Sequence, residues 1–204
     1  MTWEAWTVFV VTETVLCLTP GPAVLFVVAQ GLGRGAWAAL AAATGILAAN
    51  AFYFALSATG LGAVLLASYE VFSAIKWVGA AYLVWLGVRT FRAAPMPRGV
   101  PPAAGGRLVG RGFLVQVANP KALVFFSALL PQFIDPEARV LPQVAILGVT
   151  SLLVELVVLA AYGTLAARAT HLTARPGFLA ASNRVAGGLL VAAGLRMAAL
   201  RRAP

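Results

Sequence analysis

Long apolar runs decide what this chain can fold into. Six runs, each of about 20 residues or more, are separated by short polar stretches. They lie near residues 4–30, 36–58, 70–91, 108–133, 142–167 and 178–200. Of the 204 residues, 61% are hydrophobic and 10% are charged, whereas a soluble domain carries about 25% charged residues. The pattern predicts an all-α integral membrane protein with six transmembrane helices in one domain, residues 1–204, and excludes an ordinary soluble enzyme.

Positive charge lies mostly between the runs. The 15 Lys and Arg residues against 6 Asp and Glu give a net charge of +9. On a soluble chain this excess would indicate nucleic-acid binding, but here it fits the orientation of helices in a bilayer. Arginines are twice as frequent beside one set of helix ends, which predicts a cytoplasmic central loop and both termini outside. The two sets are Arg34, Arg89, Arg92, Arg98, Arg107, Arg111, Arg168 and Arg175, and Arg139, Arg196, Arg201 and Arg202.

The two halves of the chain resemble each other. TPGPAVLF at 19–26 aligns with NPKALVFF at 119–126, and GAAYLVWLGVR at 79–89 aligns with AGGLLVAAGLR at 186–196. Because each half holds three spans, an odd number, the second copy would be inserted upside down relative to the first. We expect two inverted repeats, residues 1–92 and 108–204, joined by a cytoplasmic linker at 93–107. Inverted repeats are typical of secondary transporters.

Proline motifs interrupt the first and fourth runs at matching positions. The residues are Thr19, Pro20, Gly21 and Pro22 in the first run, and Asn119 and Pro120 in the fourth. Proline has no N–H, and its ring clashes with the carbonyl four residues earlier, so the carbonyls of Leu16, Leu18 and Gln116 lose their helical partners. Such groups are costly in hydrocarbon unless they face protein or a watery cavity. A simple packing kink is the alternative for either motif, but the matching pair favours broken helices.

Each motif also has the signature of a helix restart. Thr19 and Asn119 are good N-cap residues, and proline is favoured at the first helical position. We expect half-helices to begin at residues 20 and 120, with their free N–H groups and positive dipole ends directed into the protein. A substrate carboxylate would bind there.

Two ionisable residues of opposite sign lie within the predicted spans. Lys121 follows the second break, where it either holds the substrate carboxylate or forms an ion pair with a glutamate. Glu155 lies near the middle of the fifth span and shares a helix face with Ser151 and Tyr162. A carboxylate at this depth either carries a proton, binds a substrate ammonium, or serves only as the partner of Lys121.

Four further polar residues are candidates for the site. Glu13 lies about two turns before the first break and either faces the same cavity, with a role in proton coupling, or reaches water at the outer interface. Asn50 and Asn183 either bind substrate or join neighbouring helices by hydrogen bonds. Tyr82 either directs its hydroxyl to the site or serves packing.

No catalytic or metal-binding pattern accompanies these residues. The chain has one histidine and one cysteine, and contains neither HExxH nor GxSxG. We therefore expect no metal, no cofactor and no enzyme activity. Soft-metal transport would need more thiols or imidazoles, whereas transport of a hard or organic cation through Glu13 and Glu155 stays open. A non-transporting assembly subunit would not need broken helices.

Four motifs in this order resemble the lysine-exporter superfamily of bacterial amino-acid efflux proteins, especially its homoserine/threonine branch. They are TPGPAVLF (19–26), FSAIKWVGAAYLVWLG (72–87), ANPKALVFFSALLPQFI (118–134) and ELVVLAAYGTLA (155–166), and the resemblance covers nearly the whole chain. It implies a multi-pass protein of the bacterial cytoplasmic (inner) membrane that exports small amino acids, driven by protons. It maps the family's proline break onto Thr19–Pro22, its Asn-Pro-Lys onto Asn119–Lys121, its acidic position onto Glu155 and its tyrosine onto Tyr82.

One departure from the family bears on the substrate. Members often carry an acidic residue in the second span, where this chain has Asn50, and this favours neutral substrates over lysine or arginine. We therefore predict an antiporter that exports homoserine- or threonine-like amino acids, with the carboxylate at Lys121 and the half-helix ends. The ammonium would meet Glu155 and neighbouring asparagine amides. The alternative is export of basic amino acids or another small cation. Its partners would be the substrate, protons and the lipid bilayer, while homo-oligomerisation stays open.

Overall fold

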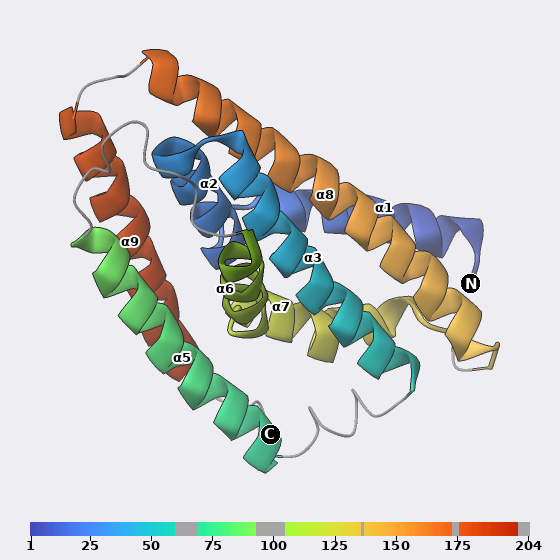
Figure 1. Cartoon of the computed structure of the whole chain (residues 1–204). Coiled ribbons are helices and arrows are strands. Elements are labelled where there is room, and N and C mark those ends of the chain that lie inside the picture. Colours follow the sequence, from blue (N-terminus) through green and yellow to red (C-terminus); the bar gives the residue numbers. More distant parts are fainter. Residues whose placement is uncertain (60–68, 93–104, 136, 173–175, 200–204) are drawn as a thin grey trace.

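The structure is a computed structural model that describes residues 1–59, 69–92, 105–135, 137–172 and 176–199. Within these ranges the regular elements are helices, and no strand is present (Figure 1). In chain order they are α1 (Trp3–Leu18), α2 (Pro22–Arg34), α3 (Ala36–Ala58), α5 (Tyr69–Phe91), α6 (Gly105–Val117), α7 (Pro120–Val124), the π-helical turn η1 (Phe125–Leu129), the 3-10 turn η2 (Leu130–Phe133), α8 (Val140–Leu172) and α9 (Pro176–Ala199). Most of the predicted linker lies outside the described residues.

All six predicted runs form helices. Helices α3, α5, α8 and α9 match the second, third, fifth and sixth runs, and α8 continues past the predicted end at 167 to Leu172. The first and fourth runs are broken, as expected from their prolines: α1 and α2 bend by 51°, and so do α6 and the segment Pro120–Phe133. The sequence therefore predicts both the helices and the two interruptions.

The helices are apolar enough for a membrane protein. Among the described residues, α3 and α8 are each long and apolar enough to cross a bilayer, and the number rises to four if each bent pair counts as one span. Large apolar side chains are exposed along the outer sides of α1 and α8, including Val11, Val15, Leu153 and Val157. Exposed apolar faces of this extent are expected where a protein meets lipid.

The first break differs in detail from the prediction. Helix α1 ends at Leu18, and its C-cap is Thr19, whose N–H donates to the carbonyl of Leu16 and whose hydroxyl donates to that of Val15. The second half-helix begins at Pro22, with Gly21 as its N-cap, so the predicted start at residue 20 with a Thr19 N-cap is wrong. The reason is Pro22, because a residue that precedes proline is driven out of the helical region. Gly21 is accordingly extended, with φ −142° and ψ −175°.

The second break has the predicted form. Asn119 is the N-cap of α7, its side-chain oxygen accepts the Lys121 N–H at 3.0 Å, and Pro120 is the first helical residue. Here Ala122 occupies the position that Pro22 has in the first motif, so nothing prevents the helix from starting at once. Beyond Val124 the helix widens and then tightens through η1 and η2. Pro131 lies in this stretch and cannot continue the regular hydrogen-bond ladder.

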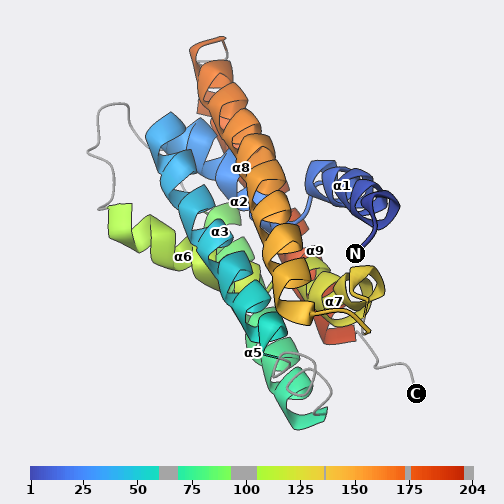
Figure 2. The same cartoon turned by 90° about the vertical axis from the view of Figure 1, so that its right-hand side faces the viewer.

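Helices α3 and α8 form the centre of the molecule. They pack against each other, with α2 against both and α6 along α3, and the two views show α3 and α8 side by side (Figures 1 and 2). Glycine permits the closest approach: a Cβ atom at Gly45 would collide with the backbone of Val109, and one at Gly112 with the carbonyl of Ala42. This contact holds α6 against α3 and so places the second break beside α3.

Helices α5 and α9 form a separate pair. They pack extensively against each other along one side of the molecule, and their contacts with the other helices, chiefly α6 and α2, are much smaller (Figure 1). A Cβ atom at Gly87 would lie 2.7 Å from the carbonyl oxygen of Gly187, and one at Gly194 would lie 2.9 Å from that of Ala80. Because glycine has no side chain, the two helix backbones can approach each other closely at these positions.

Adjacent glycines on α9 test this packing. A Cβ atom at Gly187 would lie 2.5 Å from the backbone nitrogen of Phe91, whereas one at Gly188 would meet nothing within 4 Å. Because overpacking costs about 1–3 kcal/mol, we expect Gly187→Ala to lower the Tm of the purified protein by roughly 2–12 °C. Gly188→Ala, the matched control, should leave the Tm unchanged or raise it slightly. Equal Tm values for the two variants would contradict the close contact of α5 and α9.

Candidate functional site

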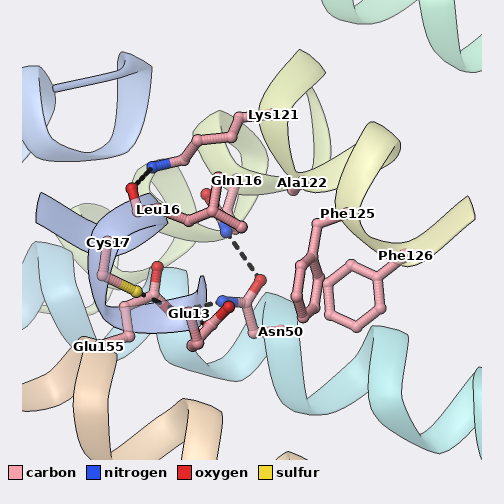
Figure 3. A pocket seen from close by; sticks show the side chains of 10 residues that line it. All are labelled: Glu13, Leu16, Cys17, Asn50, Gln116, Lys121, Ala122, Phe125, Phe126 and Glu155. Atoms are coloured by element: carbon pink, nitrogen blue, oxygen red, sulfur yellow. Dashed lines mark hydrogen bonds between the residues drawn. The ribbon is translucent and has the colours of Figure 1, made fainter. Parts of the chain in front are cut away.

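One side chain joins the two helix breaks. Lys121, in the first turn of α7, reaches to the end of α1, where its ammonium donates hydrogen bonds to the carbonyl oxygens of Leu16 at 2.7 Å and Thr19 at 3.2 Å (Figure 3 draws the bond to Leu16). Pro20 frees the Leu16 carbonyl because it has no N–H to offer. The C-terminal end of a helix also carries partial negative charge. Lys121 therefore supplies a cation to the carbonyl end of α1, where Leu16 also accepts from the Thr19 N–H at 3.1 Å.

The other freed carbonyls also have donors. The Tyr162 hydroxyl of α8 donates to the carbonyl of Leu18 at 2.9 Å. The Asn119 N–H donates to that of Gln116 at 3.0 Å. Next to it, the Tyr53 hydroxyl of α3 donates to the carbonyl of Val117 at 3.0 Å. Since carbonyls without partners are costly in hydrocarbon, these contacts are what allows the helices to be interrupted there.

A chain of buried amides leads from the second break to Glu155. The side-chain nitrogen of Asn119 donates to the oxygen of Gln116 at 2.9 Å, and the nitrogen of Gln116 donates to the oxygen of Asn50 at 2.7 Å. The nitrogen of Asn50 then donates to the carboxylate of Glu155. All four side chains are buried. Each amide accepts on its oxygen and donates from its nitrogen, so the chain runs in one direction and ends on a carboxylate.

Glu13 is a second buried carboxylate beside Glu155. Its Oε1 accepts from the Ser151 hydroxyl at 2.5 Å and from the Cys17 thiol at 3.6 Å, and the residue is 5% exposed. Glu13 therefore faces the interior of the protein, and of its two alternatives this excludes the one in which it reaches water at the outer interface. Ser151 and Glu155 lie one turn apart on α8, so both carboxylates converge on the same part of that helix.

These groups surround a small polar cavity (Figure 3). It is lined by Glu13, Leu16, Cys17, Asn50, Gln116, Lys121, Ala122, Phe125, Phe126 and Glu155. Its volume is about 30 Å³. This is enough for water but far below the roughly 300 Å³ or more of small-molecule sites. An amino acid therefore enters only if the surrounding groups separate.

A much larger cleft lies on the other side of Lys121. It has a volume of about 660 Å³, within the usual range for small-molecule sites. We call it the break cleft; it is lined by Leu16, Pro20, Gly21, Pro22, Leu25, Asn119, Pro120, Lys121, Val124, Phe125, Leu129, Leu189, Ala192, Ala193 and Arg196. Leu16, Lys121 and Phe125 line both spaces. The hydrogen bond from Lys121 to Leu16 is therefore part of the wall between the break cleft and the polar cavity.

The sequence matches a family model, described as LysE type translocator, over residues 14–201. The chain belongs to this family. It is 36% identical to the homoserine/homoserine lactone efflux protein of Salmonella typhimurium, with 100% of both chains covered. It is 32% identical to an uncharacterized membrane protein of Vibrio cholerae, over 96% of this chain and 97% of that one, and 32% identical to the leucine efflux protein of an Enterobacter species, over 65% and 64%. No solved structure matches the chain.

The resemblance inferred from the four motifs is thus confirmed at the family level. In this LysE-type chain, most of the predicted site residues line one of two neighbouring spaces. The polar cavity holds Glu13, Asn50, Lys121 and Glu155, and the break cleft holds Pro20, Gly21, Pro22, Asn119 and Pro120 together with Lys121. Thr19 contributes its carbonyl to Lys121. The two spaces therefore share the lysine, and each is lined by its own subset of these predicted residues.

Two predicted residues lie elsewhere. Tyr82 lines an apolar cavity of about 330 Å³ formed by residues of α5, α6 and the second break, and its buried hydroxyl has no hydrogen-bond partner in the described part of the chain. Asn183 is half-buried in α9 and is not among the residues that line the polar cavity or the break cleft. Neither residue is among those that line the polar cavity around Glu155.

The alternative in which Lys121 forms an ion pair with a glutamate is not present within the described ranges. The carbonyls at the end of α1 take the ammonium instead. Gln116, which the sequence analysis did not single out as a site residue, is the middle member of the amide chain. The available signal was its position one turn before Asn119, on the same helix face, in an otherwise apolar stretch.

Two tyrosines give a matched test of the carbonyl contacts. Tyr53→Phe leaves the Val117 carbonyl without a donor beside the break, which costs about 1–3 kcal/mol, so we expect a lower Tm. Tyr82→Phe removes a hydroxyl that has no partner here, so the Tm should stay the same or rise. Both are measured by thermal unfolding in one detergent. A Tyr82→Phe loss as large as that of Tyr53→Phe would argue against this assignment.

Proposed function

We propose that this protein exports small neutral amino acids, homoserine- or threonine-like, from the cytoplasm across the bacterial inner membrane in exchange for protons. The relatives named as efflux proteins for homoserine and its lactone and for leucine support the substrate class. The observation that carries the proposal is the meeting of a lysine and two buried carboxylates at a pair of helix breaks. Opposite charges in one intramembrane site suit a zwitterion.

The proposed architecture is six spans in two inverted repeats, residues 1–92 and 108–204, with the linker at 93–107 in the cytoplasm. The equal bends of 51° at proline motifs 100 residues apart support the repeat. Helices α5 and α9, with 23 and 24 residues, are about 35 Å long, which is enough for the two spans beyond those already described. Broken helices at matching positions support a substrate site between the proposed repeats.

Substrate would bind by replacing contacts within the protein. Its carboxylate would take Lys121 from the carbonyls of Leu16 and Thr19, close to the start of the half-helix at Pro22. Its ammonium would take Glu155 from the amide of Asn50. Both exchanges separate groups that now close the polar cavity, so binding and opening would occur together. The proposal does not depend on Tyr82 or Asn183.

Glu155 would couple export to protons. A carboxylate that either carries a proton or pairs with the substrate ammonium cannot do both at once, and this exclusion is the basis of antiport. After the amino acid leaves on the outer side, a proton on Glu155 would let the empty site return without a buried charge. Glu13, held by Ser151 beside it, is the second candidate for this role.

Export of basic amino acids or another small cation is the second candidate function. It is favoured by the two carboxylates that line the polar cavity with a single lysine. When both are ionised, the site has a net negative charge and would attract a cation. A panel of preloaded substrates separates the two functions, because only the second requires that basic amino acids move while neutral ones do not.

Charge-neutral substitutions test the site. Glu155→Gln preserves an oxygen for the Asn50 amide but can neither titrate nor pair with an ammonium, and Lys121→Met removes the cation. We expect each to lower efflux from vesicles preloaded with homoserine, threonine, leucine or lysine at least tenfold, with or without a pH gradient. Glu137→Gln, on an exposed loop, should leave efflux unchanged.

The lysine substitution also exposes carbonyls, so Lys121→Arg, which retains the charge, accompanies it as a check on folding. Partial efflux from Lys121→Arg with a normal Tm is expected. Normal efflux from both Glu155→Gln and Lys121→Met would refute the assignment.

Glu13→Gln separates the two carboxylates. The Ser151 hydroxyl can still donate to the glutamine oxygen, so the fold should hold. If Glu13 shares the proton, this variant exports amino acids but responds less to an imposed pH gradient than the unmodified protein does. If the pH gradient stimulated efflux equally in Glu13→Gln and in the unmodified protein, proton coupling would be assigned to Glu155 alone.

A further inference from the structure

The break cleft carries cations and no acid. Among the described residues that line it, the charged ones are Lys121 and Arg196, and both glutamates lie beyond Lys121 in the polar cavity. The remaining walls are mainly aliphatic, from residues such as Leu25, Leu129 and Leu189. Such a cleft favours a solute that carries a carboxylate and an apolar or small side chain, and it disfavours a basic side chain.

Arg196 and Lys121 line this cleft from different groups of packed helices. Arg196 lies in the last turn of α9, which is paired with α5, whereas Lys121 belongs to α7 at the second break. Within the described part of the chain no hydrogen bond or ion pair occupies the Arg196 side chain, which is exposed. Its planar guanidinium is therefore free to bind a carboxylate through two parallel hydrogen bonds.

We propose that Arg196 is a second carboxylate-binding residue, which receives the carboxylate of an amino-acid substrate from Lys121 within the break cleft. The inference rests on the proposed function. Lys121 lines both spaces and Arg196 lines only the larger one. A substrate carboxylate that moves from Lys121 into the break cleft moves away from Glu155. Among the described lining residues, Arg196 is the next cation that it meets. Arg196 also belongs to the set of arginines whose positions predict the outer side of the membrane, which makes it an exit-side contact.

The test compares amino acids with analogues that lack the carboxylate. Leucinamide and homoserine lactone keep the ammonium and side-chain atoms of leucine and homoserine but offer Arg196 no anion. In proteoliposomes we expect Arg196→Gln to raise the apparent KM for leucine and homoserine about tenfold, equivalent to about 1.4 kcal/mol. The inhibition constant Ki of leucinamide or of the lactone against leucine efflux should be unchanged. Arg196→Lys should restore part of the affinity.

Arg139→Gln is the matched control. It removes the same charge on the same predicted side of the membrane, from an exposed residue that does not line the cleft. Its KM for leucine should equal that of the unmodified protein. This comparison separates a local contact from a general effect of surface charge on orientation or stability.

Two outcomes would overturn the inference while leaving the proposed function intact. One is an unchanged KM in Arg196→Gln. The other is an equal loss for the acids and for their blocked analogues, which a merely structural role would produce. If the unmodified protein moved no member of the amino-acid panel, the proposed function itself would fail, and this inference with it.

Discussion

The hydrogen bonds from Lys121 to the last carbonyls of α1 are the contact on which the interior depends. A helix that stops in hydrocarbon leaves carbonyls without donors, and a lysine there needs acceptors for its charge. Each of these groups would be unfavourable alone. Together they stabilise one another, and because Lys121 follows the second break while Leu16 precedes the first, the same contact joins the two halves of the chain. A break in one half is thus supported by a residue from the other.

The remaining polar groups extend this arrangement toward α8. The amide chain connects the cap of α7 to Glu155, while Ser151 and Cys17 hold Glu13. Around this small polar centre, α6 and α8 each pack densely against α3, and α5 packs densely against α9, whereas the packing between these two groups of helices is sparser. The break cleft lies along that boundary, between the proline motifs and α9. The Tyr82 hydroxyl, which has no hydrogen-bond partner among the described residues, lies on the same boundary, where α5 meets α6. Space and an unsatisfied polar group thus coincide with the weakest packing, where relative movement would break the fewest contacts.

Apolar periodicity and proline chemistry make most of the fold predictable from the sequence. The runs specify the helices, and Asn119-Pro120 specifies a capped restart at the observed residue. The same rule failed at Thr19-Pro20, because the effect of Pro22 on Gly21 outweighs the capping preference of Thr19. Individual polar residues could be selected because ionisable groups are rare in hydrocarbon, which identified Glu13, Lys121 and Glu155. Their partners could not be predicted: the end of α1 reaches Lys121 only through the packing of distant segments, and helical spacing says nothing about contacts 105 residues apart.

In this conformation the charged groups of the site are satisfied by neutral ones. Carbonyl oxygens hold Lys121, and an amide N–H meets Glu155. Both contacts already include one ionisable group, and an oppositely charged partner would add Coulomb attraction to the hydrogen bond. A carboxylate therefore competes well for the lysine, and an ammonium for the glutamate. Under the proposed function, a solute with only one of these charges would replace one contact and leave the other closed, whereas an α-amino acid would replace both. Two simultaneous exchanges would therefore favour a zwitterion, and the shape of the break cleft would distinguish its side chain.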